Sequence, residues 1–183
     1  MVAACPQWAQ NLLETWFEEL GPDDWFRGGE QVDRLLSARF ESVLDEQAAQ
    51  PVDSFLADPL TARAAILLFD QVPRNLYRDS ARAFAYDPLA RMLAHAVIAR
   101  GWDEGLPNSE RQFVAMPLMH SEELADQEAS LAYFAEHLPG NLSFARKHHE
   151  MIARFGRFPH RNELLGRETT PEEQRAIDEG FSW

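Results

Sequence analysis

Basic and hydrogen-bonding side chains crowd the segment RFGRFPHR and the asparagine that follows it. This segment contains Arg154, Arg157, His160, Arg161 and Asn162, in a chain whose formal net charge is −13. Planar guanidinium groups bind carboxylates and phosphates through two parallel hydrogen bonds. The segment therefore predicts an anion clamp, and the alternative is that its arginines pair with the chain's own acidic residues.

A second polar group follows directly after an apolar helix. The residues DQVPRN contain Asp70, Gln71, Arg74 and Asn75. Because the preceding helix is expected to be buried, it would deliver these side chains to the interior or to a pocket wall. Their alternative role is to cap that helix and to tie down the long connection that follows, which would be functional or locally helical.

A third group interrupts the apolar face of a helix expected at 122–138. Apolar residues recur at Leu124 and Leu131, and the turn between them is filled by Gln127 and Glu128. Both polar side chains are therefore expected to point inward. Buried polar groups need partners, which a neighbouring arginine or histidine could supply.

Three histidines are candidates for proton transfer. His148 is spaced at helical intervals from Phe144 and Ile152, so it is expected to point inward, either as a core residue or as a catalyst. Together with His120 and His160 it could surround a metal beside Asp126 or Glu122. No paired metal-binding motif supports this, so no metal is assigned, and the sequence names no cofactor.

The elements that must position these residues are helical, because apolar residues recur at helical and not at alternating spacing. Asp58, Asp87 and Thr170 each precede a proline, which is typical of a helix start, and Glu173 completes a capping box with Thr170. Gly156 is expected to end a helix in the left-handed conformation. Helices are predicted near 6–20, 30–45, 59–70, 88–100, 109–116, 122–138, 142–155 and 171–179, with a short turn around 161–165. The helix at 59–70 is apolar almost all round and is expected at the centre of the fold.

Composition limits the class of protein. The chain has 183 residues, 45% of them hydrophobic, which suits a single all-helical domain over residues 1–183. The acidic excess argues against nucleic acid or an anionic membrane surface as a partner. The six-residue apolar run 64–69 is too short to span a bilayer. With Cys5 as the single cysteine and no visible signal peptide, a reducing cytoplasm is the expected location.

Three segments together carry a family resemblance: ILLFDQVPRNLYRDSARAFAYDP, MPLMHSEELADQE and RFGRFPHRNELLGRETTPEE. The chain resembles the bacterial domain-of-unknown-function family numbered 924, from the WF pair near the N-terminus to the TPEE helix. The resemblance implies a tetratricopeptide-like array of about seven to nine antiparallel-packed helices. It implies no activity, cofactor or catalytic residue.

Two hypotheses follow for function. The first is a pocket for a small anionic metabolite bearing a phosphate or carboxylate, with His148 or His120 moving protons and Asp70 or Glu128 orienting that histidine. The ligand would be held by Arg74, Asn75, Gln71, Gln127, Arg157, His160, Arg161 and Asn162. The second is a non-enzymatic tetratricopeptide-like scaffold that binds a peptide or protein partner, its polar groups fixing helix register. Whether the protein is an enzyme, and its oligomeric state, stay open.

Overall fold

The fold is all-α. A computed structural model describes residues 5–181, and every regular element within that range is a helix, which confirms the predicted fold class. The α-helices are α1 (Gln7–Glu14), α2 (Pro22–Arg27), α3 (Glu30–Ala48), α4 (Pro59–Asp70), α5 (Val72–Leu76), α6 (Asp87–Ala99), α7 (Asn108–Met119), α8 (Leu124–His137), α9 (Leu142–Phe155) and α10 (Pro171–Asp178). The sequence does not predict the short helices α2 and α5. The tetratricopeptide-like arrangement stays a prediction.

The chain forms two compact units, the first ending at Pro117 and the second beginning at Leu118. Each unit is described by itself below. The expected single domain over residues 1–183 stays a prediction. Among the residues described, no helix combines the length and apolar character needed to cross a membrane.

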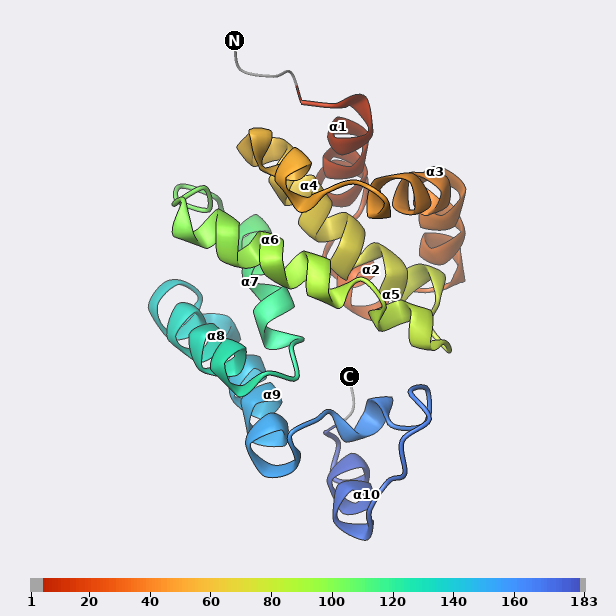
Figure 1. The fold of residues 1–183 in the computed structure, drawn as a ribbon, viewed down its shortest axis with the longest axis vertical. Coiled ribbons are helices and arrows are strands. Elements are labelled where there is room, and N and C mark those ends of the chain that lie inside the picture. Colours follow the sequence, from red (N-terminus) through yellow and green to blue (C-terminus); the bar gives the residue numbers. More distant parts are fainter. Residues whose placement is uncertain (1–4, 182–183) are drawn as a thin grey trace. The chain divides into compact units, whose positions relative to one another are not determined.

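Helix α4 is the core of the first unit. Asp58 caps it by accepting hydrogen bonds from the backbone N–H groups of Leu60 and Thr61, at 3.0 and 2.9 Å. Nine of its twelve residues are buried, as expected for a helix that is apolar all round. It packs against α1 and α6, and α3 packs against α5 (Figure 1). The segment DQVPRN therefore begins at Asp70, the last residue of this buried helix.

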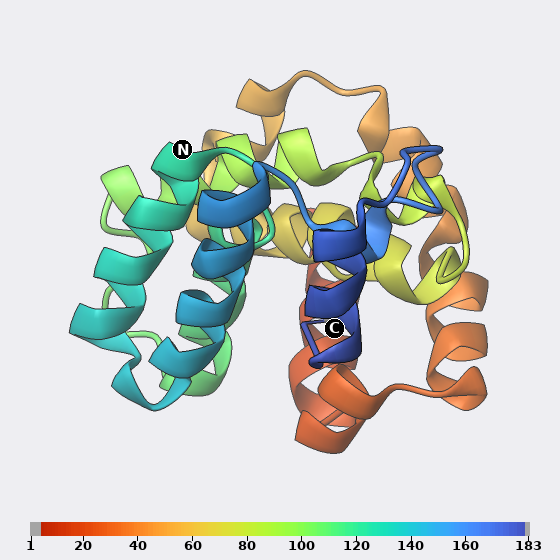
Figure 2. The same cartoon turned by 90° about the horizontal axis from the view of Figure 1, so that it is seen from below.

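The second unit is built on α8 and α9. A short 3₁₀ turn at Pro139–Asn141 joins them, so they run antiparallel and lie side by side, as both ribbon views show (Figures 1 and 2). A smaller core forms between the end of α9, the loop after it and α10, and its buried members are Met151, Ile152, Phe158 and Ala176. This loop carries the RFGRFPHR segment.

Helix ends in the second unit follow local chemistry. Gly156 ends α9 at φ 68° and ψ 8°, the left-handed conformation that glycine adopts without steric cost. The predicted capping box of α10 is present: the Thr170 hydroxyl accepts from the Glu173 N–H at 3.2 Å, and the Glu173 carboxylate accepts from the Thr170 N–H at 2.8 Å. Helix α8 begins at Leu124, later than predicted, because the Ser121 hydroxyl accepts the Glu123 N–H at 3.1 Å and stabilises a turn before the helix.

Candidate functional site

The ring of Phe158 contacts three of the predicted site residues in the second unit. This ring is fully buried and contacts the rings of His148 and His160, with centroids 5.5 and 5.7 Å away. The guanidinium carbon of Arg161 lies 4.5 Å from its centroid. His120 joins through His148, whose ring centroid is 6.1 Å from its own. We call these five residues the histidine cluster.

Three separate segments contribute to the histidine cluster. His148 points inward from α9, as its spacing predicts, and is 4% exposed. His120 lies in the turn between α7 and α8, and the remaining three residues lie in the loop after α9, where a 3₁₀ turn spans Pro159–Arg161. Phe158 is not among the residues predicted for the site, although it directly precedes Pro159 in the loop after the helix-ending Gly156.

Two histidines of the cluster, His148 and His160, are held in the neutral form. The pKa of His148 is lowered from 6.5 to about 2, mainly because the ring is buried and secondly because His120 lies nearby. Burial and the guanidinium of Arg161 likewise lower the pKa of His160 to about 4, against the attraction of Glu122. His148 Nδ1 lies 2.9 Å from the Phe144 carbonyl oxygen, which can only accept, so Nδ1 carries the proton and Nε2 is the unprotonated nitrogen. Such groups bond to a ligand as neutral donors and acceptors, and they hold protons too weakly for acid catalysis near pH 7.

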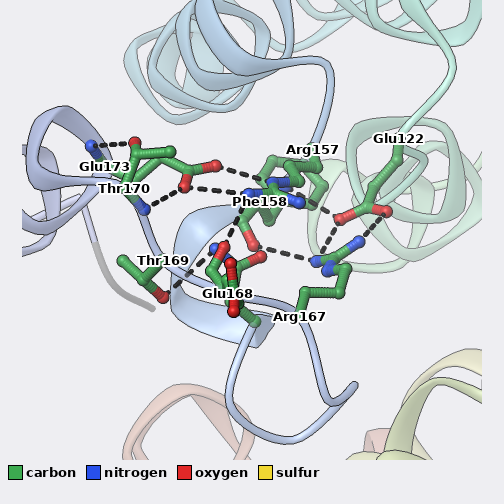
Figure 3. A network of polar contacts seen from close by, with 9 residues as sticks. Glu122, Arg157, Phe158, Arg167, Glu168, Thr169, Thr170 and Glu173 are labelled. Atoms are coloured by element: carbon green, nitrogen blue, oxygen red, sulfur yellow. Dashed lines mark hydrogen bonds and ion pairs between the residues drawn. The ribbon is translucent and has the colours of Figure 1, made fainter.

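An ion pair between Glu122, in the turn before α8, and Arg167 holds the main chain of Phe158. Glu122 accepts from both terminal nitrogens of Arg167, at 2.8 and 3.0 Å, and from the Phe158 N–H at 2.8 Å. Arg167 also donates to the Phe158 carbonyl at 3.2 Å (Figure 3). One ion pair therefore engages both polar groups of the Phe158 main chain.

Arg157 is engaged by the protein's own acid. Its guanidinium donates to both carboxylate oxygens of Glu173, at 2.6 and 3.0 Å, and to the Glu168 carbonyl at 2.8 Å (Figure 3). The pKa of Glu173 is lowered to about 2, mainly by the hydrogen bonds that Arg157 donates to its carboxylate. For Arg157 the geometry favours the second alternative left open by the sequence, internal pairing, over an anion clamp.

The polar residues of α8 differ from expectation. Glu128 is exposed, so the prediction that it points inward is wrong; Asp126 occupies the buried face instead, next to Gln127. Leu124 is 46% exposed, which shows that the apolar stripe used for the prediction was misplaced on the helix. The amide of fully buried Gln127 donates to the carbonyls of Met119 and Ser121, at 2.7 and 2.6 Å. Gln127 therefore closes the turn that carries His120.

Asn162 is buried beside the cluster. Its side-chain nitrogen donates to the Thr169 hydroxyl at 3.3 Å, and its main-chain carbonyl accepts from the main-chain N–H of Arg167 at 2.8 Å. Its side-chain oxygen has no hydrogen-bond partner within the part of the chain that the structure describes. Asn162 therefore braces the loop and keeps one buried acceptor adjacent in sequence to Arg161.

The DQVPRN residues lie in the first unit. Arg74 donates to both carboxylate oxygens of Asp87, at 2.8 and 3.0 Å, and to the Asp70 carbonyl at 2.6 Å. Gln71 donates to the Asp70 carboxylate at 2.5 Å, and Asn75 donates to the Gln71 carbonyl at 3.0 Å. These contacts match the capping and tying role, and the connection after them is locally helical, in α5 and in a 3₁₀ turn at Ala81–Phe84.

A metal-binding arrangement is not found in the described residues: none of their His, Cys, Asp and Glu side chains form a group of three or more able to hold an ion. Ring contacts and a cation–π contact join the members of the histidine cluster, and the imidazole and guanidinium groups can offer hydrogen bonds and electrostatic attraction to a ligand.

Comparisons with known proteins agree with this architecture. The family model "Bacterial protein of unknown function (DUF924)" matches residues 12–180. A solved structure of a protein of unknown function from Agrobacterium tumefaciens is 37% identical, with a TM-score of 0.88, over 94% of this chain and 97% of that one. No curated protein matches. With a family model matched over nearly its whole length, the chain belongs to the DUF924 family of bacterial proteins.

Proposed function

We propose that the protein binds a small molecule bearing a carboxylate or phosphate group at the histidine cluster, with Arg161 as the cation that holds the anionic group. The observation that carries the proposal is the convergence on one buried phenylalanine ring of a guanidinium and two histidines, from α9 and from the loop after it. Arg161 is 5% exposed, so its charge acts in surroundings where electrostatic attraction is weakly screened.

The roles that we propose for these residues differ from those expected from the sequence. Arg161 supplies the charge, while His148 and His160 supply hydrogen bonds as neutral imidazoles, since burial first and then neighbouring positive charge lower the pKa of each. Clusters of titratable groups with perturbed pKa values are frequent at functional sites. Arg74 and Arg157 stabilise the fold through their bidentate ion pairs. We propose binding, without an assigned bond-making step.

The test is a titration of the histidine side chains by NMR, with and without citrate or inorganic phosphate, together with thermal unfolding. A bound anion would stabilise the protonated form of His160, so its pKa should rise from about 4 when the ligand is present. A ligand at 100 times its Kd adds about 2.7 kcal/mol, which for this chain length raises Tm by roughly 5–10 °C.

A matched pair of variants locates the binding. His160→Asn should reduce the ligand-induced rise in Tm, while Arg154→Gln, an exposed arginine paired with Glu150 on α9, should leave it unchanged. If neither anion moves the histidine resonances or Tm, the proposal is contradicted. The same polar groups would then serve the alternative function, a tetratricopeptide-like scaffold for a peptide or protein partner.

A further inference from the structure

Three members of the histidine cluster lie in one loop. Phe158, His160 and Arg161 belong to the loop between α9 and α10, which contains a single 3₁₀ turn at Pro159–Arg161. Binding groups must be held within a fraction of an ångström of the productive geometry, and loops achieve this only when supporting contacts fix them. The contacts that fix this loop therefore determine the geometry of the cluster.

We propose that Glu122 and Arg167 are positioning residues of the histidine cluster, whose ion pair fixes the main chain of Phe158 and through it the side chains of His160 and Arg161. This inference rests on the proposed function for its consequence in binding. The Glu122 carboxylate accepts the Phe158 N–H at 2.8 Å, and Arg167 donates to the Phe158 carbonyl at 3.2 Å (Figure 3).

The electrostatics of the pair extend to His160. Burial alone would raise the pKa of Glu122, but the hydrogen bonds from Arg167 and Phe158 lower it below its usual value, so Glu122 is ionised at neutral pH. Its negative charge opposes the effects of burial and of Arg161 on His160. Glu122 therefore influences the histidine cluster through the field of its charge as well as through the position of the loop.

The same loop provides an internal control. Glu173 makes an analogous set of contacts: two hydrogen bonds from an arginine, Arg157, and one from a backbone N–H, that of Thr170 at 2.8 Å. None of these contacts reaches the main chain of Phe158. Substituting Glu173 therefore perturbs a similar ion pair in the same segment without removing the contact that the proposal requires.

The experiment compares Glu122→Ala, Glu122→Gln and Glu173→Ala in the intact chain without ligand. In Glu122→Ala, hydrogen exchange at the Phe158 amide should rise about tenfold or more beyond any change in global stability, because a charge-assisted hydrogen bond is lost. The pKa of His160, followed by NMR of the imidazole nitrogens, should fall below its wild-type value. Glu122→Gln keeps an acceptor and should restore part of the protection of Phe158 without restoring the pKa.

Glu173→Ala should lower Tm while leaving both local signals at their wild-type values. The proposal is overturned if Glu122→Ala changes neither signal, or if Glu173→Ala changes both to the same extent. These measurements need no ligand, so they are independent of the proposed function. Citrate affinity supplies the link: wild type should bind and Glu122→Ala should bind at least about tenfold more weakly, and a wild type that fails to bind overturns the proposed function alone.

Discussion

At the scale of single residues, the arginines of this chain divide by what they contact. Arg157 and Arg74 each donate two hydrogen bonds to one carboxylate, Glu173 and Asp87 respectively. Arg161 lies over the ring of Phe158, which also contacts the rings of His148 and His160. A guanidinium already held by two parallel bonds is a brace for the chain, so net positive charge in a motif is a poor guide to anion binding.

Arg157→Ala should therefore destabilise the protein. The change removes two charge-assisted hydrogen bonds and leaves the carboxylate of Glu173, 2% exposed, without its principal partner. The expected result is a Tm lowered by roughly 5–10 °C in a chain of this length. Thermal unfolding followed by circular dichroism measures it.

Arg154→Ala is the control, because its pair with Glu150 is exposed and should contribute less than about 0.5 kcal/mol. An Arg157→Ala variant that melts with wild type would return Arg157 to the list of candidate ligand-binding residues.

At the scale of elements, local signals were predictable and long-range pairings were not. The Thr170–Glu173 capping box and the inward position of His148 follow from spacing along one helix, and both are present. Glu128 was misplaced because the start of α8 and its buried face were inferred from an apolar stripe that includes exposed Leu124. The partner of Arg157 lies beyond a loop, in α10, where helical periodicity carries no information about distance.

The contribution of the glycine that ends α9 to the free energy of unfolding can be measured. Gly156 has φ 68°, and a Cβ at this position would meet nothing within 4 Å. Gly156→Ala should therefore cost about 1–2 kcal/mol through backbone conformation alone, without a steric clash. The free energy of unfolding in urea provides the measurement.

Gly140→Ala is the matched control, because Gly140 lies in the turn before α9, has no positive φ and also has open space around its Cβ. It should be neutral or slightly stabilising, since alanine restricts the unfolded chain. Equal stabilities for the two variants would show that the left-handed conformation of Gly156 does not limit the choice of residue.

At the scale of the whole molecule, neutral buried histidines and an ionised buried glutamate make stability depend on pH in two separate ranges. His148 and His160 have folded pKa values below 6.5. The unfolded chain therefore binds more protons than the folded one once the pH falls below about 6.5. Glu173, with a folded pKa of about 2 against 4.5 unfolded, acts in the same direction at lower pH. Family membership alone does not predict this pH dependence, which follows from the particular groups that are buried.

The free energy of unfolding should accordingly be highest above pH 6.5 and should fall as the pH is lowered from 6.5 towards 4. Each histidine contributes a slope of up to about 1.4 kcal/mol per pH unit in this range, as the unfolded state becomes protonated and the folded state does not. Below about pH 4.5 the contribution of Glu173 is lost in addition, down to about pH 2.

Urea unfolding at steps of half a pH unit from pH 7.5 to 4 measures this slope. The variant His160→Asn should reduce the slope by the contribution of one histidine, because asparagine binds no proton in either state. A stability that is flat between pH 6.5 and 5, or a His160→Asn slope equal to that of wild type, would show that the histidines are protonated in the folded protein and that burial does not hold them neutral.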